Sequence, residues 1–249
     1  MRTLYLIPLM ALGLQAAESL FETPAERMFD TKLTSAQRND ACFELRGQAT
    51  KPVVAAMAKA LESDLLRACA ATNLRVAGAV EELRRAMDHE SVDIRAMAAQ
   101  ELGSFALPEM LPVLGKAAAD ANLLVATNGV EGLSRYSSLE VLPYLQTLAK
   151  KGGIVGILAL DRMEVMKDPA ALGISRQLLH SPQAPDRVAA IRVIGEFGDT
   201  TDLPALREIS KLKDMPMPQQ RGFGLMPPIS LSKAALASIA EIEKRPLTR

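Results

Sequence analysis

An apolar residue recurs along this chain at nearly constant spacing. A period near 30 residues indicates stacked supersecondary units, because one unit cannot bury its apolar face alone while a row of units shares a continuous core. The spacing therefore predicts a repeat protein of six units. The recurring positions, which lie 29, 28, 31, 30 and 31 residues apart, are Leu45, Leu74, Leu102, Leu133, Met163 and Ile194.

The units also resemble one another over whole strings of residues. The string 67–74 aligns without gaps with 95–102, so that an arginine, three alanines and a leucine coincide. The same step of seven residues from an arginine to the apolar position recurs in the first and sixth units. A second apolar position follows in every unit, six to nine residues after the first. These second positions are Val54, Val80, Leu111, Leu142, Leu172 and Leu203.

Within each unit the apolar residues follow a helical period. Ile94, Ala98 and Leu102 share one helix face, and a second run of the same period begins at Leu107. Each unit therefore holds two helices, and we expect almost no sheet. Breaks between helices are expected at Gly103-Ser104, Ser137-Ser138 and Gly198-Asp199-Thr200, and breaks between units at Asp64, Asp88, Asp120 and Ser181.

The pattern predicts an all-α solenoid, or superhelix, of antiparallel helix pairs, with about six repeats and a terminal half repeat. We expect a signal peptide at 1–17, a lead-in or N-terminal cap at 18–33 and the repeat array at 34–213. A Pro/Met/Gly-rich loop at 214–228 and a C-terminal capping helix and tail at 229–249 complete the chain.

Two motifs resemble those of HEAT repeats. Leu102-Gly103 is followed by Leu111-Pro112, and Ile194-Gly195 is followed by Leu203-Pro204. Units near 31 residues resemble the HEAT-like repeats of bilin lyases and of many bacterial proteins. The resemblance implies a surface for protein interaction. The fourth and fifth units depart from the pattern, because Ala126 and Gly156 stand where the arginine is expected.

The N-terminus favours export. Arg2 supplies a positive charge, residues 4–14 form an apolar run, and Gln15-Ala16-Ala17 offers small residues for cleavage. The run is too short to span a bilayer, which takes about 20 residues, so no transmembrane anchor is expected in the mature protein. We expect a periplasmic or secreted location; the alternative is an apolar cap on the first helix.

The two cysteines gain interest from this location, since an oxidising compartment permits a disulfide between Cys42 and Cys69. Counted from the recurring arginine of each unit, the two cysteines differ in position by half a helical turn or more along neighbouring helices. This offset favours two small buried residues over a disulfide. His89 and His180 are interpreted as solvated residues in turns. No cluster has the spacing of zinc ligands, and we expect neither metal nor cofactor.

The sequence contains no phosphate loop, no Gly-x-Ser-x-Gly elbow and no His-Glu-x-x-His pair. Gly152-Gly153 with Gly156 is interpreted as a degenerate first helix rather than as a nucleotide loop. Glu81-Glu82 beside Arg84-Arg85 is typical of an exposed helix face with ion pairs. We therefore expect no enzyme. Equal numbers of basic and acidic residues, 29 of each, argue against nucleic acid as a partner.

The second helices offer the sharpest hypothesis about binding. When these helices are aligned on the second apolar position of each unit, further apolar residues follow three and six positions later. Many of the exposed positions between and beyond them are basic. We expect a concave surface with positive bias that binds an acidic protein segment; a merely solvated face is the alternative. The candidate residues are Lys59, Arg84, Arg85, Lys116, Gln146, Lys150, Arg176, Arg207 and Lys211.

Three functions remain open. The first is an exported scaffold for protein interaction, as a monomer or with weak self-association. The second is a structural, self-assembling component, which exposure of Ile239 and Ile242 would favour. The third is a ligand-handling protein like the bilin lyases. Three interpretations of the loop at 214–228 also remain open. It could bind a partner through Phe223, hold Cu(I) through the thioethers of Met215 and Met217, or simply connect two helices.

Overall fold

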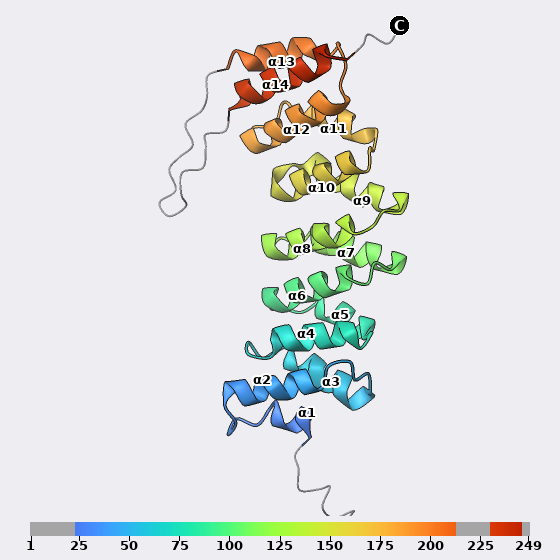
Figure 1. The fold of residues 1–249 in the computed structure, drawn as a ribbon, viewed down its shortest axis with the longest axis vertical. Coiled ribbons are helices and arrows are strands. Elements are labelled where there is room, and N and C mark those ends of the chain that lie inside the picture. Colours follow the sequence, from blue (N-terminus) through green and yellow to red (C-terminus); the bar gives the residue numbers. More distant parts are fainter. Residues whose placement is uncertain (1–22, 213–229, 246–249) are drawn as a thin grey trace, which may run out of the picture. The chain divides into compact units, whose positions relative to one another are not determined.

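The computed structural model describes residues 23–212 and 230–245, and within these ranges the regular structure consists of helices and contains no strand (Figure 1). The chain is therefore an all-α solenoid built from antiparallel helix pairs, as the periodicity predicts. The expected signal peptide and the expected loop at 214–228 lie outside the described residues.

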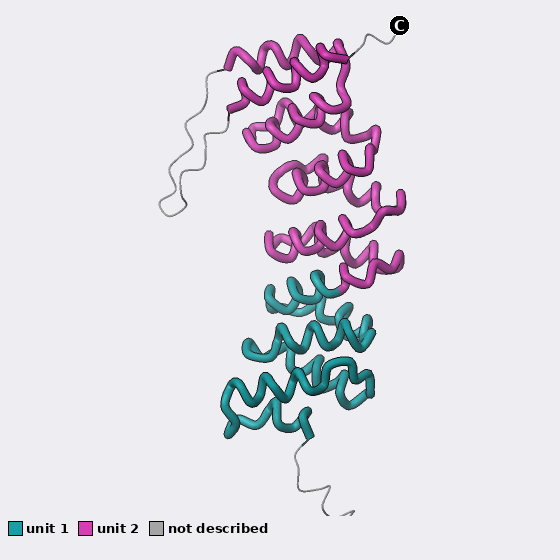
Figure 2. The backbone as a smooth tube through the Cα atoms, viewed as in Figure 1, with its two compact units in different colours: residues 1–101 teal, residues 102–249 magenta. Residues whose placement is uncertain are grey.

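The chain divides into two compact units, residues 1–101 and 102–249, which are coloured separately in Figure 2. The boundary falls near the end of α6 (Val92–Gly103). Each unit is a stack of helix pairs in which first and second helices alternate along the chain.

The first unit begins with a single turn of helix and continues with two complete pairs. Thr34 caps α2 through a capping box with Gln37, whose backbone N–H donates to the threonine hydroxyl over 3.3 Å. First helices α2 and α4 pack against each other, and α3 packs on α4 and α5. The helices before α6 are α1 (Pro24–Arg27), α2 (Ser35–Glu44), α3 (Lys51–Ala60), α4 (Arg67–Val76) and α5 (Val80–Ala86).

The second unit repeats the same arrangement and ends on α14, which is the first helix of a half repeat. Each second helix packs on the first helix that follows it, and α14 packs on both α12 and α13, as the predicted half repeat requires. The helices are α7 (Leu111–Ala118), α8 (Leu123–Ser134), α9 (Leu142–Lys151), α10 (Gly153–Val165), α11 (Ala170–Leu178), α12 (Ala184–Phe197), α13 (Leu203–Ser210) and α14 (Leu231–Glu243). Short 3₁₀ turns, Pro108–Met110 and Leu139–Val141, precede α7 and α9.

The core follows the predicted anchors. All six first-helix anchors are at most 3% exposed. The second-helix anchors are less deeply buried, and Val54, Val80, Leu142 and Leu172 are only half-buried. The residues three positions later form the innermost row instead. This row consists of Met57, Leu83, Leu114, Leu145, Ser175 and Leu206.

Small residues let neighbouring helices approach closely. A Cβ built on Gly129 of α8 would lie 2.3 Å from the backbone nitrogen of Ala118, at the end of α7. No side chain larger than hydrogen fits at this contact. The predicted helix breaks are also confirmed, since α6 ends at Gly103, Ser137-Ser138 separates α8 from the next turn, and Gly198 follows α12.

Cys42 and Cys69 form a disulfide, so the expectation of two separate buried residues is wrong. Their sulfur atoms lie 2.12 Å apart and their Cα atoms 6.4 Å apart. The offset of two residues between neighbouring helices amounts to only about 3 Å of rise, which lies within the reach of a disulfide. The two helices that carry the cysteines pack on each other, and the adjacent residues Ala41 and Ala70 are small and fully buried.

Candidate partner-binding surface

In the first unit, the predicted basic residues already have local partners. The ammonium group of Lys59 lies 4.7 Å from the centre of the Phe29 ring. Arg84 pairs with Glu81 over 3.9 Å and Arg85 with Glu82 over 3.7 Å, which confirms the predicted ion-paired helix face. The positive charge of α5 is therefore balanced within its own helix.

Several predicted residues of the second unit are balanced in the same way. Arg207 pairs with Glu243 over 2.9 Å, and Lys211 pairs with Glu208 over 2.7 Å. Gln146 donates a hydrogen bond to the buried Asp168 over 2.8 Å. These side chains lie on the second helices, as predicted, but they contribute little net charge to the surface.

Arg176 is held most firmly. Its Nε and Nη2 atoms donate to the two carboxylate oxygens of Asp202 over 2.8 and 2.9 Å, and Asp202 is only 7% exposed. The hydrogen bond to Asp202 raises the pKa of the Arg176 guanidinium. Nearby, hydrogen bonds from Thr201 lower the pKa of the Asp199 carboxyl. Arg176 therefore fastens α11 to the turn before α13 and is poorly placed to bind a partner.

Helices α7 and α9 carry basic side chains and no acidic ones, as α3 and α11 also do. The sequences of α7 and α9 contain Lys116, Lys150 and Lys151 and no aspartate or glutamate. All three lysines are exposed. The side chains of Lys150 and Lys151 make no hydrogen bond or ion pair with any described residue. Lys151 was missed by the alignment of second helices, because it lies one position beyond the basic row.

A pocket of about 250 Å³ opens between these two helices. Its lining combines small and apolar groups with one lysine and belongs wholly to the second unit. The lining residues are Gly115, Ala119, Pro143, Tyr144, Thr147, Leu148 and Lys151.

The pocket lies where α7 carries a glycine in place of a long side chain. Gly115 stands four positions after its anchor, where Arg84 and Arg176 stand in other units. The Tyr144 ring fills part of this space, since a Cβ on Gly115 would lie 2.4 Å from Tyr144 Cδ1. The remaining space is the pocket. The absence of a long side chain at Gly115 was the available sequence signal.

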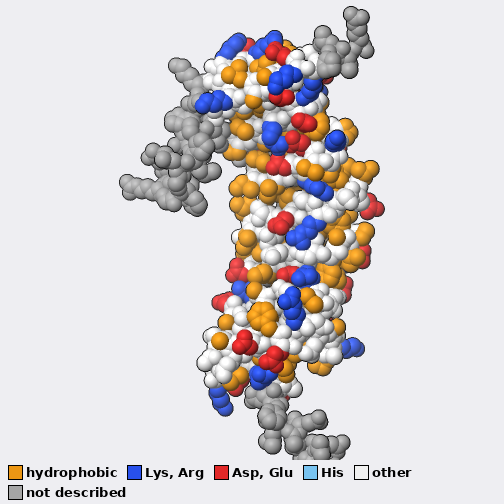
Figure 3. Space-filling model, in the orientation of Figure 1, with side chains coloured by type: hydrophobic (Ala, Val, Ile, Leu, Met, Phe, Trp, Pro, Cys, Tyr) orange, Lys and Arg blue, Asp and Glu red, His pale blue; other side chains and the backbone are white. Residues whose placement is uncertain are grey.

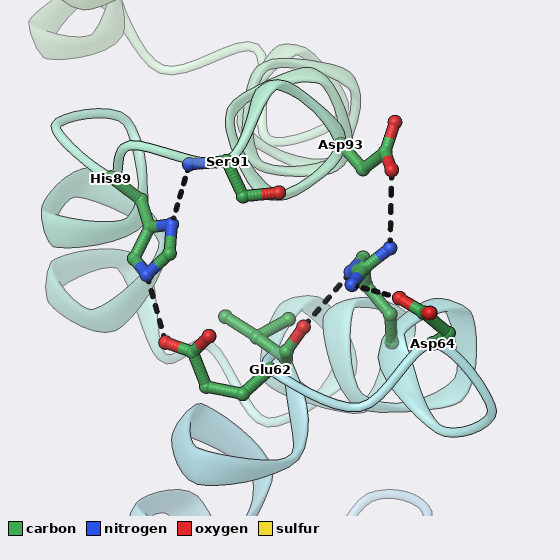
Figure 4. Close-up of polar contacts among 7 residues, drawn as sticks. Glu62, Asp64, His89, Ser91 and Asp93 are labelled. Carbon is green, nitrogen blue, oxygen red and sulfur yellow. Dashed lines mark hydrogen bonds and ion pairs between the residues drawn. The ribbon is translucent and has the colours of Figure 1, made fainter.

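His89 belongs to a polar network in the first unit, which Figure 4 shows. Its Nδ1 atom accepts a hydrogen bond from the Ser91 backbone N–H over 2.9 Å, and its Nε2 atom lies 2.8 Å from Glu62. Both ring nitrogens are engaged, so His89 fixes a turn rather than lying free in solvent. His180, in contrast, is exposed just after α11, as predicted.

The recurring arginines serve the stack itself. Arg38 donates to the Met28 carbonyl over 3.0 Å, and Arg67 donates to the Leu61 carbonyl over 2.9 Å. Arg95 bonds to carbonyls of the preceding turn in the same manner. These contacts tie the starts of α2, α4 and α6 to the segments before them. At these three positions the recurring arginine is therefore structural, which the sequence pattern alone does not reveal.

The two isoleucines whose exposure would favour self-assembly are not exposed. Ile242 is only 3% exposed and Ile239 is half-buried, so this condition is not met. Large apolar side chains are exposed on several elements. They include Leu123 and Leu124 of α8, Ile154, Leu158 and Val165 of α10, Leu139 in the 3₁₀ turn before α9, and Leu236 of the terminal helix α14. On the face drawn in Figure 3, acidic and basic side chains alternate with hydrophobic ones.

Among residues 23–212 and 230–245, no group of three histidine, cysteine or carboxylate side chains is arranged to hold a metal ion. None of the helices in these ranges combines the length and apolar character that crossing a bilayer requires. The methionines of the proposed copper site lie outside the described residues.

The family comparison agrees with the repeat geometry. Residues 80–155 match the model of HEAT repeats. These residues are HEAT repeats. Helices α7 and α9, with the pocket between them, lie entirely within the matched HEAT repeats.

Beyond this match, the chain is similar to solved structures at low identity. Human deoxyhypusine hydroxylase in complex with glycerol is 17% identical, with 94% of this chain and 99% of that chain covered and a TM-score of 0.40. The complex of CpcE and CpcF of phycocyanin lyase from Nostoc sp. PCC7120 is 16% identical, with 97% and 100% covered and a TM-score of 0.43. No curated protein matches this sequence.

Proposed function

We propose that this protein is an exported, non-enzymatic HEAT-repeat scaffold that binds another protein through the second helices of its second unit. Repeat stacks of this kind present extended surfaces and lend themselves to recognition. The observation that carries the proposal is the pair of exposed lysines on the last turn of α9, Lys150 and Lys151, whose side chains have no ion-pair partner among the described residues. Such a local excess favours an acidic segment as the partner.

Two features support export. Residues 1–17 have the order of a secretory signal, with a basic start, an apolar run and small residues before Glu18. The disulfide between Cys42 and Cys69 adds an independent reason, because such bonds persist in oxidising compartments and are rare in the cytosol. The intact mass of the protein purified from its native host tests export. A mature chain beginning near residue 18 is expected, and a chain that retains Met1 or Arg2 would contradict it.

Affinity capture from an extract of the native compartment tests the scaffold. The wild type is compared with a Lys150→Glu/Lys151→Glu variant at about 50 mM and about 300 mM salt, since screening weakens exposed charge pairs. A Lys32→Glu/Lys51→Glu variant is the control, because it makes the same change of net charge at exposed residues of the first unit. Circular dichroism verifies that all three proteins are equally helical.

We expect the wild type and the control to capture the same protein at low salt and less of it at high salt. The Lys150→Glu/Lys151→Glu variant should capture at least about tenfold less. Capture of no protein by the wild type would contradict the scaffold function, and equal capture by the α9 variant would contradict the location of the surface.

A further inference from the structure

We infer that the pocket between α7 and α9 receives one apolar side chain of an acidic protein segment, while Lys150 and Lys151 bind carboxylates that flank this side chain. The inference rests on the proposed function and names the chemistry of its partner. It follows from the size of the pocket, the character of its lining and the charge around it.

The size of the pocket favours a side chain over a small molecule. Its volume of about 250 Å³ lies below the range of about 300–1,000 Å³ that is usual for ligand pockets. A single leucine or phenylalanine side chain, in contrast, needs only a shallow pocket to exclude water. Apolar anchors of this kind carry most of the binding energy at many protein interfaces.

Much of the lining is apolar. Gly115 of α7 and Ala119, which follows that helix, supply one wall, and Pro143 and Leu148 supply the other from α9. Thr147 also lines the pocket, but its hydroxyl already donates to the Pro143 carbonyl over 2.8 Å. The pocket therefore offers no unsatisfied donor from this hydroxyl, and burial of an apolar group there costs no hydrogen bond.

The rim carries the charge. Lys151 lines the pocket, and Lys150 precedes it on the last turn of α9. Since neither lysine side chain has an ion-pair partner among the described residues, an incoming acidic segment meets two ammonium groups that are available for pairing. Charge complementarity of this kind sets the orientation and the rate of association. The apolar pocket and the two lysines thus select a segment in which acidic residues surround an apolar one.

Fluorescence anisotropy with three labelled peptides of twelve residues tests this selection. The first peptide has a central Leu-Phe pair between aspartates and glutamates, the second replaces the pair by Ala-Ala, and the third keeps the pair between lysines. The whole protein is used as the wild type and as two variants. Ala119→Leu fills the pocket from an exposed position, and Ala55→Leu makes the same change at an exposed position of α3.

We expect saturable binding of the first peptide, about tenfold weaker binding of the second and no saturable binding of the third. Ala119→Leu should weaken the first peptide about tenfold, whereas Ala55→Leu should leave it unchanged. Equal affinity for the two acidic peptides, failure of all three to bind, or unchanged affinity of Ala119→Leu would overturn the inference.

The Ala119→Leu variant also separates this inference from the proposed function. If it captures the same protein as the wild type from the native extract, then the pocket is not the anchor site but the scaffold function stands. If the wild type captures nothing, the proposed function itself fails.

Discussion

The carboxylate of Asp186, on α12, accepts a hydrogen bond of 2.8 Å from the backbone N–H of Gly153, at the start of α10. The same carboxylate accepts a second bond of 2.7 Å from the Ser181 hydroxyl and is only 2% exposed. One repeat thus supplies the cap for the first helix of the repeat before it. The glycine pair at 152–153 belongs to this cap, and its resemblance to a phosphate-binding loop has a structural cause.

Alanine substitutions distinguish two reasons for glycine at these positions: the positive φ angle and the close approach of Asp186. Both glycines have positive φ angles, +67° at Gly152 and +69° at Gly153, so alanine is strained at either position by about 1–3 kcal/mol. Only at Gly152 would the new Cβ also lie 2.4 Å from an oxygen of Asp186. We expect Gly152→Ala to lower the free energy of unfolding in urea by at least about 1 kcal/mol more than Gly153→Ala. Equal losses would show that the approach of Asp186 does not require glycine.

The cap on α10 is a contact that the sequence pattern could not predict. The repeat period and its apolar anchors predicted the helix pairs, because burial of a periodic face is a property of each unit alone. The bond from Gly153 to Asp186 joins residues 33 positions apart, and no period links them. The same holds for the pocket, which depends on a missing side chain at Gly115, and for the neutralisation of Arg207 by Glu243 from a different helix.

The close contact between α7 and α8 gives a second prediction. In Gly129→Ala the Cβ would meet the backbone of Ala117 and Ala118, which cannot move without shifting the helix. Gly173 of α11 is the control, because its Cβ would meet no atom within 4 Å. We expect Gly129→Ala to lower the melting temperature. Gly173→Ala should raise the free energy of unfolding by about 0.5–1 kcal/mol through helix propensity. A stabilising Gly129→Ala would contradict the packing of α7 on α8.

The disulfide contributes through the unfolded chain. Because it closes a loop between residues 27 positions apart, chain entropy assigns it about 3.5 kcal/mol of stability. We expect the Cys42→Ala/Cys69→Ala variant to unfold at lower urea concentration than the oxidised wild type. Dithiothreitol should destabilise the wild type and leave the variant unchanged. Titratable thiols in unfolded, non-reduced wild type would instead show that the bond is not formed.

The contact between Arg176 and Asp202 is expected to act on stability rather than on partner binding. Arg176→Ala leaves a carboxylate that is only 7% exposed without its bidentate partner, which costs about 1–3 kcal/mol. Arg207→Ala is the matched control, because its partner Glu243 is half exposed and such pairs contribute about 0–1 kcal/mol. Chemical denaturation of both variants measures the difference. A loss for Arg207→Ala as large as that for Arg176→Ala would argue against the role assigned to Asp202.

The most direct test of the central claim, that α7 and α9 form the binding surface, is lysine footprinting without any substitution. The protein is acetylated in the intact native compartment and again after purification, and each lysine is quantified by mass spectrometry. The account predicts that Lys150 and Lys151 are protected in the compartment and reactive in the pure protein, while Lys32 and Lys51 react equally in both. Equal acetylation of Lys150 and Lys151 in the two states would contradict it.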